Sequence, residues 1–200
     1  GGGVIGASVA YQLDKRGRKV ILVEKGDFAS GASGSCDTSI FLQSKNAGIH
    51  LQLALASAEI FKGLQEELGH DIEYHFKGGM ILIETAEEMK VMEGFVARQQ
   101  ETGLQVEIIG RREASGLQRG LAEHLAGSTY SAQDGDVNPI ELTLGFAKAA
   151  RRLGAGILLE TEVTGCVVKS GRVQGVETSR GPVHAPVVVN AAGAWAPVFG

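Results

Sequence analysis

The sequence has few cysteines, no long apolar run and no basic tract. Its two cysteines, Cys36 and Cys166, lie far apart without metal-ligand spacing, so we expect no metal site and a reducing, cytoplasmic compartment. The apolar stretches are too short and too interrupted to span a bilayer, and no signal peptide is visible. Any membrane association would therefore go through a partner. A net charge of −4 without a basic tract argues against nucleic acid as a partner.

The chain has 200 residues, of which 44% are hydrophobic, and this suits one medium domain or two small ones with a sizeable core. It begins on a glycine rather than a methionine, and no strand precedes its first motif. It also ends directly after a motif. We therefore expect a fragment of a longer protein.

The first stretch of the chain predicts a dinucleotide-binding turn. The glycines Gly1, Gly3 and Gly6 form the pattern G-x-G-x-x-G, which allows a tight turn, a close approach of pyrophosphate and close helix packing. The helix expected at residues 7–13 would point its first amides at the phosphates. The strand expected at 20–23 ends in Glu24, placed to accept hydrogen bonds from a ribose hydroxyl. The alternative, a structural turn without a ligand, does not account for this acid.

The middle of the chain predicts a small-residue loop followed by alternating helices and strands. The loop at 26–35 is either a flexible linker or a cradle for a second phosphate or a flavin edge. A helix is expected at 46–69, and a hairpin from strands 71–76 and 79–83 with Lys77-Gly78 in its turn. Further elements are expected as a helix at 87–102, a strand at 105–109, a helical turn at 111–117 and a strand at 125–131.

The last third predicts a capped helix and then strands. Asn138 is expected to cap the helix, with Pro139 at its first position and Glu141 completing a capping box. From Gly156 the apolar pattern has period two, which predicts strands at 157–160, 163–169, 173–178 and 183–189 with two hairpin turns. The last strand runs into the small-residue turn at 191–195, a second place where the backbone could approach a cofactor.

Five blocks together resemble the FAD-dependent oxidoreductases of the D-amino-acid oxidase type, which include sarcosine oxidase, glycine oxidase and amine dehydrogenases. The blocks are GGGVIGASVAYQLDKRG, VILVEKGDFASGAS, GDVNPIELTLGFAKAARRLGA, TEVTGCVVKSGRVQGVETSRG and VVVNAAGAW. The resemblance implies an α/β fold: a Rossmann-like FAD-binding domain at 1–70 and 136–200, and a largely antiparallel α+β substrate domain, incomplete here, at 71–135. NAD is the competing occupant, but the small-residue loop and the final block favour FAD.

The resemblance also implies which residues bind FAD. The pyrophosphate turn would comprise Gly1, Gly3, Val4, Ile5 and Gly6. Glu24 would hold the adenosine ribose beside the basic Lys25, and Ser30, Ala32 and Ser33 would pass near the pyrophosphate and ribityl chain. The backbone of Val163 would meet the adenine, and Ala192 and Gly193 would close over the dinucleotide, with Trp195 just beyond.

The chemistry implied is oxidation of the carbon–nitrogen bond of a small amine or amino acid, with hydride passing to flavin N5 to give an imine. The electron acceptor would be oxygen, a quinone or a partner protein. Ser39 and Leu42 stand where sarcosine-oxidase-like relatives carry flavin-facing arginines, which leaves Lys45 as the catalytic candidate, with a surface lysine as the alternative. Cys36 could replace the histidine that binds flavin covalently in some relatives, although a small buried thiol is the simpler expectation.

Two other functions stay open. The chain could belong to a flavin-holding subunit without turnover of its own in a hetero-oligomeric dehydrogenase, as the missing arginines suggest. It could also serve an FAD-dependent hydroxy-acid or glycerol-phosphate dehydrogenase on the same fold.

Overall fold

The computed structural model describes residues 1–199, and they form an α/β fold with one parallel strand pair and three antiparallel sheets. The α/β fold class expected from the sequence is confirmed. The chain divides into two compact units. Unit 1 comprises Gly1–Asp37, Gln65–Ile72 and the residues from Asn138 on; unit 2 comprises Thr38–Leu64 and Glu73–Val137. The domain boundaries expected from the sequence remain a prediction about the whole protein.

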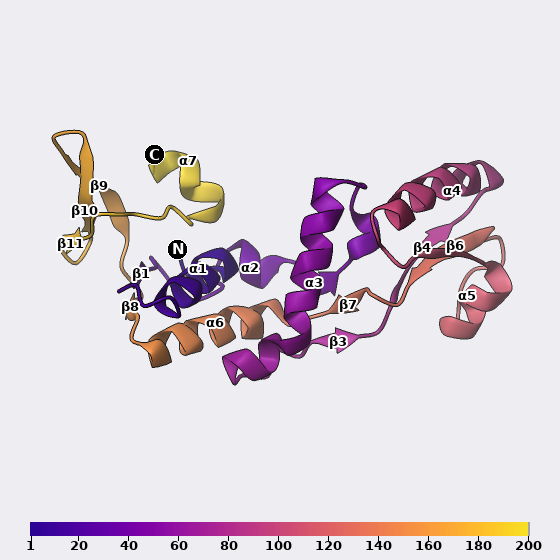
Figure 1. The fold of residues 1–200 in the computed structure, drawn as a ribbon, viewed down its shortest axis with the longest axis horizontal. Coiled ribbons are helices and arrows are strands. Elements are labelled where there is room, and N and C mark those ends of the chain that lie inside the picture. Colours follow the sequence, from indigo (N-terminus) through magenta and orange to yellow (C-terminus); the bar gives the residue numbers. More distant parts are fainter. Residues whose placement is uncertain (200) are drawn as a thin grey trace. The chain divides into compact units, whose positions relative to one another are not determined.

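Unit 1 is built on two neighbouring helices and a parallel strand pair. Helix α1 (Val4–Asp14) follows the glycine turn, and β1 (Ile21–Val23) pairs in parallel with β8 (Gly156–Leu158). Helix α6 (Pro139–Leu153) packs along α1, as Figure 1 shows. Small buried side chains let the helices approach closely: Ala7, Ala10, Ala147 and Ala150. Tyr11 and Phe146 add an aromatic contact, with ring centroids 5.9 Å apart.

The start of α6 matches the expected cap but not the expected capping box. The Asn138 side chain accepts hydrogen bonds from the amides of Ile140 and Glu141, and Pro139 takes the first position. The reciprocal bond does not form, because the Asn138 amide donates to the Ile72 carbonyl. The Glu141 carboxylate instead lies 2.7 Å from His70 Nε2.

The antiparallel sheet of unit 1 contains β9 (Val163–Lys169), β10 (Arg172–Thr178) and β11 (Val183–His184) in the order β11-β10-β9. Both hairpins expected here are confirmed. The strand expected at 183–189 is wrong beyond His184, because residues 185–190 have no ladder partner among the residues described. They run on to the short helices η2 (Gly193–Trp195) and α7 (Ala196–Phe199).

Unit 2 contains two antiparallel sheets. In the larger, β6 (Gly127–Ser131) lies between β4 (Gly79–Ile83) and β5 (Glu107–Gly110). In the smaller, β7 (Gly135–Asp136) lies between β2 (Ser39–Ile40) and β3 (His75–Phe76). The hairpin expected at 71–83 is therefore wrong. The Gly78 amide donates to the Asp134 carbonyl, and β3 and β4 enter different sheets.

Unit 2 also contains helices. They are α4 (Ala86–Glu101), α5 (Arg111–Leu117), the 3₁₀ turn η1 (Leu42–Ser44) and most of α3 (Ile49–Leu68), whose last residues belong to unit 1. The core cluster consists of Leu42, Leu51, Ala58, Val96, Leu104 and Val106. Across residues 1–199, none of the helices has the length and apolar character that a membrane crossing needs.

Candidate functional site

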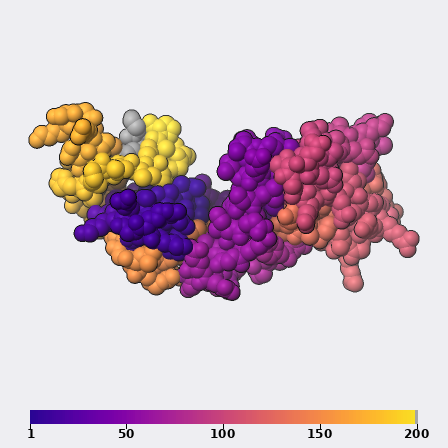
Figure 2. All heavy atoms as spheres, in the orientation of Figure 1, coloured from indigo at the N-terminus to yellow at the C-terminus, as the bar shows by residue number. Residues whose placement is uncertain are grey.

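The glycine turn of unit 1 is held together by direct backbone contacts. A Cβ at Gly6 would clash with the carbonyl oxygen of Gly1, and a Cβ at Gly1 would clash with the carbonyl of Ala191. Any side chain at Gly1 or Gly6 would therefore force the backbone apart. The segment at Ala191 thus packs on the first residues of the chain, where Figure 2 shows the last, yellow residues beside the first, indigo ones.

Glu24 follows β1 and faces the glycine turn. Its Oε2 accepts a hydrogen bond from the Gly2 amide at 2.5 Å, and its Oε1 accepts one from the Gly26 amide at 2.8 Å. The Glu24 carbonyl accepts from the Thr161 amide, and Val163 begins β9 two residues further on. A half-buried carboxylate is thus fixed at the mouth of the turn.

The small-residue loop reaches the start of α1. Ser33, in the single turn α2 (Ala32–Ser35), accepts a hydrogen bond on Oγ from the Val4 amide at 2.9 Å. The Ala29 amide donates to the Gly2 carbonyl, which ties the loop to the turn a second time. Ser30 and Ala32 are exposed on this loop.

The final turn also reaches this place. The Lys25 ammonium lies 4.1 Å from the centroid of the Trp195 ring, and that ring lies 3.6 Å from where a Cβ of Gly31 would be. Ala192 directly precedes η2, which begins at Gly193. Residues from three distant parts of the sequence therefore surround the glycine turn.

This arrangement fits the adenine dinucleotide of FAD. The first intrahelical bond of α1 runs from the Ala7 amide to the Gly3 carbonyl, so the amides of Val4, Ile5 and Gly6 precede the hydrogen-bonded ladder. Such amides, at the positive end of a helix dipole, bind phosphate. The Ser33 hydroxyl already fills one acceptor position there, as a phosphate oxygen would. The Glu24 carboxylate supplies the acceptor that a ribose hydroxyl needs.

Other candidates lie elsewhere. Lys45 is exposed in unit 2, Ser39 is exposed in β2, and Leu42 is buried in the core of unit 2. The expectation that Cys36 is a buried thiol is wrong, because its side chain is exposed and its Sγ lies 3.4 Å from the Ser33 carbonyl. Within residues 1–199, no three His, Cys, Asp or Glu side chains come together as a metal site would require.

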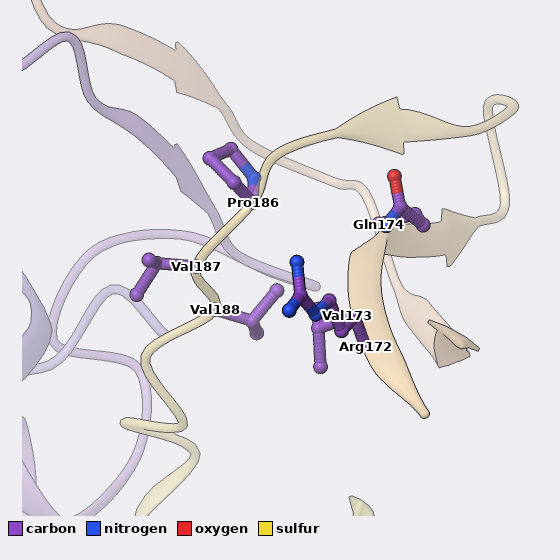
Figure 3. Close-up of a pocket in the computed structure, with 6 residues that line it drawn as sticks. All are labelled: Arg172, Val173, Gln174, Pro186, Val187 and Val188. Atoms are coloured by element: carbon purple, nitrogen blue, oxygen red, sulfur yellow. The ribbon is translucent and has the colours of Figure 1, made fainter. Parts of the chain in front are cut away.

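Two open grooves are described, one in each unit. The groove in Figure 3 belongs to unit 1 and lies between β10, with Arg172 and Val173, and the extended stretch with Val187 and Val188. None of the residues expected to bind FAD lines it. The other, in unit 2, is lined by Thr38, Ser39, Phe41, residues 77–80 and residues 134–136.

The sequence reasoning missed two residues of this site. Gly2 carries the amide that binds Glu24, and a Cβ there would lie 2.9 Å from Glu24 Cγ. The sequence contains a signal for Gly2, since it stands at an unrestricted position of the motif and is nevertheless the middle one of three consecutive glycines. Trp195 was placed only beyond the site, and no local pattern indicates that its ring meets Lys25.

The fold and this site define a dinucleotide-binding α/β protein. The family model described as "FAD dependent oxidoreductase" (DAO) matches residues 1–200, and the chain belongs to that family. The resemblance found in the sequence is thereby confirmed. Because the family is FAD-dependent, the expectation of FAD as cofactor is confirmed for the family.

Curated relatives cover several activities. Glycine oxidase of Geobacillus kaustophilus is 36% identical over all of this chain and 55% of its own length. The mitochondrial pyruvate dehydrogenase phosphatase regulatory subunit of Mus musculus is 31% identical over 98% of this chain and 22% of its own length. One of the subunits of anaerobic glycerol-3-phosphate dehydrogenase of Escherichia coli K12 is 30% identical over 98% of this chain and 36% of its own length.

Solved structures agree with the fold. The L-proline dehydrogenase of P. horikoshii matches all of this chain and 53% of its own, with a TM-score of 0.93 and 31% identity. The glycine oxidase of Geobacillus kaustophilus matches all of this chain and 55% of its own, with a TM-score of 0.93 and 35% identity. The chain thus spans from about a fifth to about half the length of these relatives. These structures also support the Rossmann-like fold expected from the sequence.

Proposed function

We propose that this chain is the FAD-binding part of an oxidoreductase that oxidises the carbon–nitrogen bond of a small amine or amino acid. The observation that carries the proposal is the Glu24 carboxylate held by the amides of Gly2 and Gly26 beside the start of α1. Two relatives support the amine class, since glycine oxidase and L-proline dehydrogenase are named for amino acids and match the whole chain.

Each expected residue has a proposed task. The amides of Val4, Ile5 and Gly6 would bind the pyrophosphate between Gly1 and Gly3, and Glu24 would accept hydrogen bonds from the ribose. One side of the bound dinucleotide would be lined by Lys25, Ser30, Ala32 and Ser33, and the other side by Val163, Ala192 and Gly193. The flavin would take up the hydride from the carbon beside the amine. Lys45 remains the proposed catalytic residue, because no flavin-side arginine occurs at Ser39 or Leu42.

The decisive experiment is anaerobic flavin reduction of the whole protein. The panel contains glycine, sarcosine, proline and D-amino acids, together with glycerol phosphate and a hydroxy acid. Loss of the oxidised flavin absorbance with an amine, and not with the alcohols, is the expected result. Reduction by the alcohols alone would exclude an amine oxidase or dehydrogenase. A preparation that binds no flavin would exclude the whole proposal.

A second candidate is a flavin-holding subunit without turnover of its own. Two observations favour it: Ser39 and Leu42 replace the expected arginines, and one relative at 31% identity is named a regulatory subunit. If a purified single-chain preparation is bleached anaerobically by an amino acid, this candidate is excluded. A third candidate, a glycerol-phosphate dehydrogenase, is supported by the relative at 30% identity. The alcohol arm of the same panel tests it.

The compartment, the type of substrate and the electron acceptor are also proposals. We propose a cytoplasmic protein that takes a small-molecule substrate and passes electrons to oxygen, a quinone or a partner protein in a hetero-oligomer. Comparing reoxidation rates of the reduced flavin with oxygen and with a soluble quinone would separate the first two acceptors.

A further inference from the structure

Unit 2 contains a fully buried polar network behind its groove. Four side chains take part, each exposed by 1% or less: Gln43, Gln99, Thr129 and Asp134. They come from the segment after β2, from α4, from β6 and from the β6–β7 loop. Because buried polar groups need partners, the geometry of such a network is strongly determined.

Asp134 is the acceptor of this network. Its Oδ1 accepts a hydrogen bond from the Leu42 amide at 2.8 Å, and its Oδ2 accepts one from Gln43 Nε2 at 2.6 Å. Burial raises the pKa of the Asp134 carboxyl above its usual value, while the hydrogen bonds from Gln43 and Leu42 oppose this. Among the ion pairs of the described residues, none involves Asp134. Its task is therefore to accept these backbone and side-chain donors.

Gln43 links Asp134 to the sheet. Its Nε2 also donates to the Gly79 carbonyl at 2.8 Å, and its Oε1 accepts the Thr129 hydroxyl. Both neighbours of Nε2 are pure acceptors, which fixes the orientation of the side-chain amide. A Cβ at Gly79 would lie 2.7 Å from Asp134 Oδ2, so the glycine leaves the room that this arrangement needs.

Gln99, in helix α4, holds the same segment at its main-chain carbonyls. Its Nε2 donates to the Gln43 carbonyl at 2.9 Å and to the Lys45 carbonyl at 2.7 Å. The main chain from Leu42 to Lys45 is therefore held at one amide and two carbonyls by buried side chains. An exposed loop at this place would need none of these contacts.

The groove of unit 2 is lined by residues that come just before this segment. Thr38, Ser39 and Phe41 line it on one side, and residues 77–80 line it on another. Asp134 itself belongs to the lining, and Asp136, in β7, pairs with Lys77 at 3.1 Å. Burying such a network rarely adds stability over apolar packing. The network therefore serves to specify the conformation of this segment.

We propose that Asp134 is a positioning residue that, through Gln43 and the Leu42 amide, fixes the backbone of residues 42–45, which carries the proposed catalytic residue Lys45. This inference rests on the proposed function, in which Lys45 is the catalytic residue. Asp134 acts through the segment and touches neither substrate nor cofactor in this proposal. The exposed side chain of Lys45 takes its direction from a backbone that Asp134 holds at the Leu42 amide and Gln99 at the carbonyls of Gln43 and Lys45.

The test uses Asp134→Asn in the whole protein. Asparagine has one acceptor oxygen where the carboxylate has two, so its NH2 group would face either Gln43 Nε2 or the Leu42 amide, and one of the two links would break. We expect amide hydrogen exchange at Leu42 and Gln43 on the order of ten- to a hundredfold faster, the size expected for losing a buried hydrogen bond to a charged group. We also expect a slower rate constant for flavin reduction at saturating substrate, with a smaller change in KM.

Two further variants make the test specific. In the double variant Asp134→Asn with Gln43→Glu, donor and acceptor are exchanged and the acceptor for Thr129 is kept, while an acceptor now faces the Gly79 carbonyl to which Gln43 donated. This variant should restore part of the exchange protection. Asp136→Asn, two residues further on in β7 and paired with exposed Lys77, is the matched control and should leave exchange at Leu42 unchanged. If Asp134→Asn does not fold, Thr129→Val is used in its place, because it removes one donor of the same network.

The outcomes separate the two proposals. Unchanged exchange at Leu42 and Gln43 in a folded Asp134→Asn or Thr129→Val protein would overturn the positioning role. Altered exchange with an unchanged rate of flavin reduction would overturn it as well. A wild-type protein whose flavin no amine reduces would instead refute the proposed function, while the exchange result would still report on the network.

Discussion

Ser33 Oγ lies 2.9 Å from the Val4 amide nitrogen and accepts its hydrogen bond, although 29 residues separate them. The N-cap of α1 is Gly3, which has no side chain that could do this. Ser33 therefore supplies from the small-residue loop the acceptor that a helix usually finds in its own cap. The same oxygen lies where the proposed pyrophosphate would bind, so the loop and the turn form one site.

Replacing Ser33 by alanine should affect both stability and cofactor binding. Without the hydroxyl, the Val4 amide loses its acceptor, and loss of a capping hydrogen bond costs about 1 kcal/mol. We expect a lower free energy of unfolding in the flavin-free protein and a smaller deficit when FAD is present, because phosphate would then occupy the amide. Denaturant titrations with and without FAD measure this, with exposed Ser35→Ala as the control. Equal stability of Ser33→Ala and wild type would contradict it.

Gly6→Ala should disrupt the glycine turn itself. The new methyl would clash with the Gly1 carbonyl, which is backbone and cannot move without opening the turn. We expect the free energy of unfolding to fall by roughly 1–3 kcal/mol, as for other overpacked sites. We also expect FAD binding to be lost in an equilibrium titration. The matched control is Gly165→Ala in β9, where a Cβ would meet nothing within 4 Å. A Gly6→Ala protein that binds FAD as tightly as the control would refute the close contact.

Local signals determined most of the elements. The glycine spacing, the Asn138-Pro139 start and the period-two strands after Gly156 each specify structure within a few residues, and the helices and hairpins there form where expected. The 183–189 stretch shows the limit of this reasoning. Its alternating valines favour a strand, but a strand needs a neighbouring ladder, and residues 185–190 have none among the residues described.

The predictions from the sequence are wrong where a residue far away in the sequence provides the hydrogen-bond partner. His75-Phe76 carries the pattern of a hairpin strand, yet β7, some sixty residues further on, takes its hydrogen bonds. Glu141 stands at the capping-box position, yet His70 and the Ile72 carbonyl complete the contacts at that end of α6. The same holds for the site, where Glu24 could be found from its strand but the Ser33–Val4 bond could not. Contacts between segments far apart in sequence leave no periodic signal in either.

The acid dependence of unit 1 should include Glu67. Its Oε1 accepts hydrogen bonds from Lys15 at 2.7 Å and from the Tyr11 hydroxyl at 2.8 Å, and these bonds lower its pKa below the usual 4.5. A carboxyl group whose pKa is lower in the folded than in the unfolded state stabilises the folded protein at pH values above its unfolded-state pKa. This stabilisation is lost as the pH falls through the folded-state pKa. The urea midpoint of Glu67→Gln should therefore lie below that of wild type near pH 7, and the gap should narrow below pH 4.5.

The control for that pH series is Glu66→Gln, which removes the neighbouring exposed carboxylate on the same helix. Its difference from wild type should be small and should not follow the Glu67 profile. A gap between Glu67→Gln and wild type that stays constant down to pH 3 would show that the links to Lys15 and Tyr11 do not depend on the carboxylate charge.

The contact between Lys25 and Trp195 provides a spectroscopic test of the site. The ammonium lies 4.1 Å from the indole centroid, and Trp195 is the one tryptophan in these 200 residues. Lys25→Met keeps the length of the side chain and removes the charge, so the emission of Trp195 should shift and the stability should fall by about 0.5–1 kcal/mol. Subtracting the spectrum of Trp195→Phe isolates this emission if the whole protein holds other tryptophans. Arginine at position 25 should retain the contact, because guanidinium also stacks on indole. If Lys25→Met and Lys25→Arg leave the Trp195 emission equally unchanged, the turn at 191–195 does not close onto Lys25, and the grouping of three distant segments around the glycine turn would have to be abandoned.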